Sequence, residues 1–140
     1  MRAWRQPALV WFVGVGGLFG YHALYFAALA LAPAVEANLL NYLWPLLIVL
    51  LSSLLPGERL APHHIAGAAL GFARTELLFA GGGEQRFEAA ALPGFAAAFI
   101  AAFVWAGYSV MSRRLAAVPT DAVAGFCLAT ALLAVLCHLA

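Results

Sequence analysis

The sequence predicts an all-α membrane protein, a polytopic bundle of five transmembrane helices. Hydrophobic residues make up 66% of the 140 residues and charged residues only 9%, unlike any ordinary soluble domain. The apolar residues are gathered into runs close to the roughly 20 residues that a helix needs to cross a bilayer. None of these runs shows the period-two alternation of a barrel strand. The runs are Ala8–Leu31, Pro33–Leu55, Pro62–Ala80, Leu92–Met111 and Ala122–Ala140.

Arginine placement predicts the orientation, since cytoplasmic junctions of membrane proteins hold an excess of positive residues. All seven basic residues are arginine. One side would hold Arg2 and Arg5 before the first run, Arg59 after the second, and Arg113 and Arg114 after the fourth; the other side would hold only Arg86. We therefore expect a multi-pass protein of the inner (cell) membrane with a cytoplasmic N-terminus, with Gly81–Ala91 on the far side.

The first run has an alternative interpretation as a secretory signal peptide, because the stretch Ala28–Ala34 has small residues at cleavage-like spacing. Its apolar part exceeds the roughly 7–15 residues usual for such a segment, and more membrane runs follow it. A membrane helix is favoured. Gly16 and Gly20 form a small-xxx-small pair, and Gly14 and Gly17 add to a smooth surface on which a neighbouring helix can pack closely. Tyr21 and Tyr25 stand one turn apart, and their hydroxyl groups need partners. His22 beside them is either structural or a handle for protons or substrate.

The second run carries a polar stripe. Asn38, Asn41, Tyr42 and Pro45 recur at i, i+3, i+4 and i+7, so a helix would place them on one face. Pro45 would leave a backbone carbonyl free near Asn41, and asparagine in hydrocarbon is costly unless satisfied. The stripe is either helix–helix glue or a lining that faces substrate. Glu36 suggests a proton carrier, but its place in a first turn after Pro33 favours a structural role at the helix dipole.

The third run contains the small-xxx-small pair Gly67 and Gly71 and two ionisable residues, Arg74 and Glu76. These two lie two residues apart, so they do not face each other on a helix. Snorkelling or pairing with another helix is favoured over an ion site. The fourth run repeats the stripe pattern of the second, with Trp105, Tyr108, Ser109 and Ser112 at helical spacing. Cys127 and Cys137 in the last run are expected to be free thiols buried in the membrane.

Several classes of function are disfavoured. No basic block suited to nucleic acid is present, and the net charge is only +1. The adjacent His63 and His64 cannot both turn to one ion from a helix, so no metal site is expected. No nucleophile elbow or paired catalytic carboxylates occur in the membrane runs, so we expect neither an enzyme nor a cofactor.

The stretch YFAALALAPAVEANLLNYLWPLLIVLLSSLLPGERL, the following HHIAGAALGF and the later VWAGYSVMSRRL resemble the EamA-type branch of the drug/metabolite transporter superfamily, most closely its aromatic amino acid exporters. The resemblance implies ten helices in two inverted repeats, of which this chain matches helices three to seven. Residues 1–83 would then be the last three helices of one repeat and residues 84–140 the first two of the next. Arg74 and Glu76 depart from the small apolar residues usual in that family.

The resemblance further implies a central cavity lined by the first, second and fourth runs. The implied substrate-facing residues are Tyr21, Tyr25, Asn38, Asn41, Tyr42, Trp44, Pro45, Trp105 and Tyr108. The expected function is export of amino acids or similar metabolites by alternating access. The expected partners are lipid, a small-molecule substrate, and either the remaining transporter helices or further copies of the chain. An assembly protein that packs through its small-xxx-small faces without transport is the alternative.

Overall fold

The computed structural model describes residues 6–55, 57, 61–80, 89–115 and 118–139; within α4 the side chains of residues 72, 74–76 and 78–80 are outside the description. In this part of the chain all regular structure is helical, as predicted. The elements are α1 (Ala8–Leu31), α2 (Ala34–Asn41), α3 (Trp44–Ser52), α4 (Pro62–Ala80), the short 3₁₀ helix η1 (Ala89–Ala91), α5 (Leu92–Arg114) and α6 (Asp121–Leu139).

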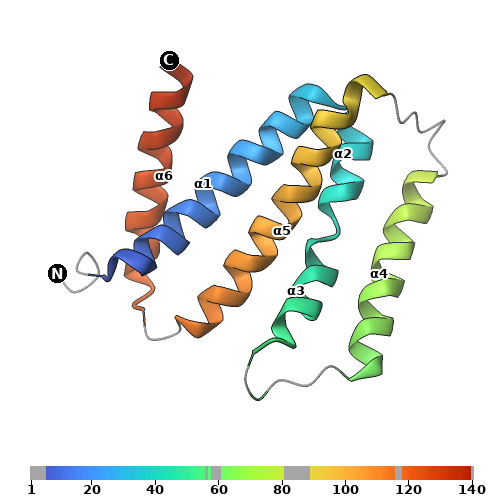
Figure 1. The fold of residues 1–140 in the computed structure, drawn as a ribbon, viewed down its shortest axis with the longest axis horizontal. Helices are drawn as coiled ribbons and strands as arrows, with labels where there is room; N and C mark the ends of the chain where they lie inside the picture. Colours follow the sequence, from blue (N-terminus) through green and yellow to red (C-terminus); the bar gives the residue numbers. More distant parts are fainter. Residues whose placement is uncertain (1–5, 56, 58–60, 81–88, 116–117, 140) are drawn as a thin grey trace.

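The helices are arranged around an antiparallel pair, α1 and α5, which lie side by side along most of their length (Figure 1). Helices α2 and α3 pack on the other side of α5, and α4 lies outermost against α3. Helix α6 crosses α1 near the start of α1 and then diverges from it. At about 1.5 Å per residue, the 24 residues of α1 and the 23 of α5 reach further than the roughly 30 Å hydrocarbon core of a bilayer.

The second run is not one continuous helix. It forms α2 and α3, separated by a turn at Tyr42 and Leu43. Pro45 has no N–H to donate to the carbonyl of Asn41, so the helical ladder is interrupted at this point. The last bonds of α2 instead tighten, with the Leu43 amide donating to the Leu40 carbonyl at 3.2 Å. The predicted loss of the hydrogen bond to the Asn41 carbonyl is thus accompanied by a break between two helices.

Four helical segments of the described chain are long and apolar enough to cross a membrane: Ala8–Leu31, Ala34–Ser52, Ala89–Arg114 and Asp121–Leu139. Helix α4 has the predicted bounds but is not among them, because its sequence includes two histidines and the charged pair Arg74 and Glu76. The described side chains of α4 are almost all exposed. The prediction that Arg74 and Glu76 snorkel or pair with another helix concerns side chains outside the described part of the chain.

Alanine dominates the helix contacts. Ala28 of α1, Ala37 of α2 and Ala98 of α5 are fully buried and pack in one cluster. A side chain of one methyl group lets helix backbones approach closely, and this is how helices gain van der Waals contact without a hydrophobic driving force. A second cluster joins α1 to α6 through Val10, Ala122 and Phe126.

The glycines that make close helix contacts differ from the predicted pair. A Cβ atom at Gly16 would meet nothing within 4 Å, and one at Gly20 would only touch Val104 at 3.7 Å. A Cβ at Gly14 would instead lie 2.5 Å from the ring of Phe126, and one at Gly17 would collide with the ring of Tyr108. The close contacts of α1 are therefore made by Gly14 and Gly17, which were predicted to add to its packing surface, rather than by the small-xxx-small pair itself.

Candidate functional site

A cluster of aromatic and amide side chains joins α1, α2 and α5 in the middle of the bundle. Six of the predicted site residues belong to it: Tyr21, Tyr25, Asn38, Asn41, Trp105 and Tyr108. We call this set the tyrosine–asparagine cluster. The two asparagines lie on α2 one turn apart, the tyrosines on α1 one turn apart, and Trp105 and Tyr108 three residues apart on α5, which is why each helix presents its pair on one face.

Rings connect α1 to α5. Tyr21 and Tyr25 are stacked with their centroids 5.7 Å apart and their planes at 5°. The indole ring of Trp105 lies 4.7 Å from the ring of Tyr21, and Tyr108 lies 5.6 Å from Trp105. These separations are in the range of favourable aromatic pairs. The result is a continuous line of four rings across two helices.

Hydrogen bonds connect α1 to α2. The Tyr25 hydroxyl donates to Asn38 Oδ1 at 2.5 Å, and the Asn38 amide donates to the Ala34 carbonyl at 2.9 Å. The Asn41 amide donates to the Tyr21 hydroxyl oxygen at 3.1 Å. Each tyrosine therefore pairs with one asparagine of α2, which partly satisfies the need of both asparagines for partners in an apolar setting.

Asn41 retains an unsatisfied group. Its side chain is 6% exposed, and its Oδ1 atom is buried with no hydrogen-bond partner in the described part of the chain. The hydroxyl of Tyr21, which accepts from Asn41, keeps its own proton for another acceptor. The Tyr21–Asn41 pair therefore offers one donor and one acceptor that the described residues leave unused, and an unused buried acceptor is rare in folded proteins.

The remaining three predicted site residues lie at the break between α2 and α3. Tyr42 is 45% exposed, while Trp44 and Pro45 are half-buried at the start of α3. The Tyr42 amide donates to the Asn38 carbonyl at 2.8 Å, but no side-chain hydrogen bond or ring contact among the described residues joins these three residues to the tyrosine–asparagine cluster. The Tyr42 backbone is still in the α-helical region, so Tyr42 keeps the register of α2, whereas Trp44 and Pro45 lie beyond the break. A part for these three residues in the site stays a prediction.

The stripe on α5 divides in two. Trp105 and Tyr108 face the cluster, whereas the Ser109 hydroxyl donates to the Trp105 carbonyl of its own helix at 2.8 Å. Tyr108 and Ser112 also line a cavity of about 180 Å³ between α1, α5 and α6. Residues of α6, including Phe126 and Val123, form its far wall. The sequence reasoning did not find these α6 residues, and no spacing within α6 signals them.

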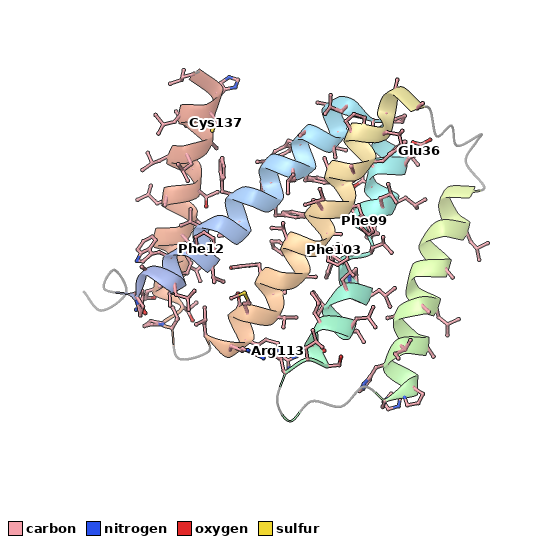
Figure 2. The ribbon with its side chains drawn as sticks, in the orientation of Figure 1. Phe12, Glu36, Phe99, Phe103, Arg113 and Cys137 are labelled. Carbon is pink, nitrogen blue, oxygen red and sulfur yellow. The ribbon has the colours of Figure 1, made fainter. Side chains whose placement is uncertain are left out.

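Other titratable residues lie outside the cluster's hydrogen bonds. The His22 ring lies against Tyr21 with centroids 5.2 Å apart, and its Nδ1 atom lies 2.7 Å from the Leu18 carbonyl of the same helix. Glu36 is buried in the first turn of α2, as its position after Pro33 predicts, at the opposite end of the bundle from Arg113 (Figure 2). Neither position tests a role in proton transfer.

Three further predictions concern residues away from the cluster. His63 and His64 are exposed at the start of α4, and their rings lie 4.2 Å apart. No group of three potential metal ligands comes together within the described residues. Cys127 and Cys137 are free thiols exposed on α6, with Cys137 near the end of that helix (Figure 2). They are not buried within these helices, and their surroundings in a membrane remain a prediction.

This architecture of membrane-length helices is that of a multi-pass membrane protein, and the chain belongs to the EamA-like transporter family, whose model matches residues 2–79. The aromatic amino acid exporter YddG of Ancylobacter novellus is 59% identical to it over 136 residues, which cover 96% of this chain and 47% of that protein. The crystal structure of another protein is similar to this chain with a TM-score of 0.96 and 56% sequence identity, covering 99% of this chain and 49% of the other. The chain thus spans about half the length of the relatives it matches.

Proposed function

We propose that this chain forms the substrate-recognising part of a transporter that exports amino acids or similar small metabolites across the cell membrane. The observation that carries the proposal is the tyrosine–asparagine cluster, because it combines four aromatic rings with an unused donor on Tyr21 and an unused acceptor on Asn41. An amino acid has the complementary groups: a carboxylate that accepts and an ammonium that donates. Membership of the EamA-like family and the printed name of the A. novellus relative support this substrate class.

Transport would proceed by alternating access. In transporters built from inverted repeats, two helix units rock against each other around a site near the middle of the bilayer. We infer that residues 1–83 belong to one such unit and residues 84–140 to the other. The chain would enter the inner membrane with its N-terminus in the cytoplasm. Its roles need no covalent chemistry, because binding and rearrangement suffice to move a metabolite.

A chimera tests this proposal. The 136 aligned residues of the A. novellus exporter are replaced by this chain, and efflux of labelled L-phenylalanine is followed from loaded vesicles. We expect saturable efflux, reduced about tenfold or more by Asn41→Leu, because a site built to bind a polar group loses strongly when that group is left unpaired. Ser52→Ala provides the control, since the Ser52 hydroxyl donates to the Val49 carbonyl of its own helix and makes no described hydrogen bond to the cluster. Efflux that is unchanged by both Asn41→Leu and Tyr21→Phe would show that the cluster is not the site.

One observation favours the second candidate, an assembly protein without transport. Cβ atoms at Gly16 on α1 and Gly67 on α4 would meet nothing within 4 Å, so small-residue faces of two helices are open to neighbours. Such faces are common at contacts between membrane helices. The chimera separates the two candidates, because an assembly role predicts that Gly16→Leu and Gly67→Leu disturb complex formation while no form of the protein moves phenylalanine.

A further inference from the structure

The cavity between α1, α5 and α6 is separate from the hydrogen bonds of the tyrosine–asparagine cluster. It adjoins that cluster only through Tyr108, which contacts Trp105 on one side and lines the cavity on the other. Thr120, at the start of α6, lies at its outer edge and is exposed. The cavity therefore lies toward the end of the bundle where α5 connects to α6.

Two glycines of α1 shape its walls. The ring of Phe126 occupies the space where a Cβ of Gly14 would be, 2.5 Å away, and the ring of Tyr108 does the same at Gly17. Phe126 is also held from behind by the edge of Trp11, with ring centroids 5.1 Å apart and planes at 82°. The rings of Phe126 and Tyr108 can therefore lie directly on the α1 backbone, because Gly14 and Gly17 have no side chains. Packing of this kind fixes the rings and keeps the space between them open.

The cavity also has available polar groups. The hydroxyls of Ser52, Ser53 and Ser109 each donate to a backbone carbonyl of their own helix, at 2.9, 2.5 and 2.8 Å. Ser112 has no such bond in the described part of the chain, although a helical serine can make one. The Tyr108 hydroxyl likewise has no described hydrogen bond. Neither oxygen is among the buried unpartnered atoms of the described residues, and both residues line the cavity.

We propose that this cavity is a binding site for a small aromatic molecule with one hydrogen-bonding group, next to the tyrosine–asparagine cluster and sharing only Tyr108 with it among the described residues. Its volume of about 180 Å³ is large enough for a single aromatic ring, since enclosed apolar cavities of ~150 Å³ accept benzene, although this cavity is partly open to the outside. The rings of Tyr108 and Phe126 favour an aromatic occupant through edge and offset contacts. Ser112 and Tyr108 favour a hydroxyl or similar group on that occupant. Binding of such a molecule does not depend on transport. A role of this cavity as a second, transient site for exported substrate would rest on the proposed function.

The test measures binding of 4-fluorophenol to the 140-residue chain in detergent micelles by fluorine NMR, with empty micelles subtracted. We expect saturable binding. Val123 lines the cavity and is partly exposed, so Val123→Phe should fill the space and weaken binding about tenfold or more. The matched control is Val135→Phe on the exposed face of the same helix, which should leave the affinity within about twofold. Signal that does not saturate, or equal effects of the two variants, overturns the proposal.

A second comparison tests the polar contact. Ser112→Ala should weaken 4-fluorophenol binding about fivefold, as expected for one lost hydrogen bond, and should leave fluorobenzene binding unchanged. Equal losses for both probes would overturn the assignment of Ser112. The outcome is separable from that of the proposed function. Binding by the chain without phenylalanine efflux by the chimera refutes the transporter alone, and efflux without saturable 4-fluorophenol binding refutes this site alone.

Discussion

At the scale of single residues, the two tyrosines of α1 have opposite hydrogen-bonding roles. Tyr25 donates its proton to Asn38, whereas Tyr21 accepts from Asn41 and keeps its proton. One tyrosine is therefore fully engaged in holding α2 against α1. The other has a donor left over, next to the unused acceptor of Asn41. This difference separates a structural contact from a candidate contact to substrate, although both residues look alike in the sequence.

The structural role of Tyr25 is testable. In Tyr25→Phe the hydroxyl is lost and Asn38 Oδ1 is left without its donor inside the bundle. We expect the free energy of unfolding to fall by about 1–3 kcal/mol, the usual cost of an unsatisfied partly buried group. Unfolding of the purified chain in micelles by increasing denaturing detergent measures it.

The control is Tyr42→Phe, because Tyr42 is 45% exposed and its hydroxyl has no described hydrogen bond. This variant should unfold like the parent chain. Equal stability of Tyr25→Phe and the parent would mean that the bond to Asn38 contributes nothing to the packing of α1 on α2.

At the scale of elements, helical periodicity predicted the runs and half of each stripe. It placed Asn38 with Asn41 and Trp105 with Tyr108 correctly, because each pair lies within one unbroken helix. It did not predict the break between α2 and α3, which separates Pro45 from the two asparagines, so the part of Tyr42 and Pro45 in the site stays a prediction. A period can be extrapolated only as far as the helix continues.

Contacts between helices were not predictable in the same way. Four glycines of α1 lie within seven residues, and small-xxx-small spacing selects Gly16 and Gly20 among them. Which face is used depends on where α5 and α6 pack, and Phe126 is more than a hundred residues away in the sequence. The α1–α6 contact, and with it the cavity, is a property of the assembled bundle rather than of any one run.

The glycine assignment gives a second prediction. In Gly14→Ala the new methyl group collides with the Phe126 ring, so we expect a loss of about 1–3 kcal/mol in stability from overpacking. Gly16→Ala places the same methyl group in open space and should be neutral, or stabilising by up to about 1 kcal/mol through helix propensity. Detergent unfolding of the two variants side by side measures the difference. If Gly16→Ala were the more destabilising variant, Gly16 rather than Gly14 would be the glycine in close contact with a neighbouring helix.

At the scale of the whole molecule, the orientation in the membrane gives a third prediction. The end of α3, the start of α4, the end of α5 and the start of α6 lie toward one end of the bundle (Figure 1). Arg113 and Arg114 end α5 there, which predicts that this end is cytoplasmic. In a chain with Cys127 and Cys137 replaced by serine, a membrane-impermeant maleimide applied to intact cells should label Ala90→Cys and not Thr120→Cys. Both positions are exposed, so a reversed labelling pattern means a reversed orientation.

The outer surface of the bundle leads to the last prediction. In the α6 span only 17% of the residues are buried, compared with 44% in the span that contains α5. Helix α6 also diverges from α1 soon after crossing it. Large apolar side chains such as Leu132, Val135 and Leu136 are exposed along α6. Most of the α6 surface thus has no packing partner among the described helices. Alternating access needs a second unit that moves against the first around a shared site, and the chain spans about half the length of its relatives.

We therefore expect the 140-residue chain, reconstituted alone, to show no saturable flux of labelled phenylalanine above empty vesicles and to self-associate through its open faces. The chimera with the A. novellus exporter, in vesicles of the same composition, is the positive control. Self-association alone should not restore transport, because the arginine bias favours one orientation and two copies inserted the same way cannot reproduce an inverted pair. Saturable flux by the chain alone, abolished by Asn41→Leu, would show instead that copies of this chain build a complete carrier.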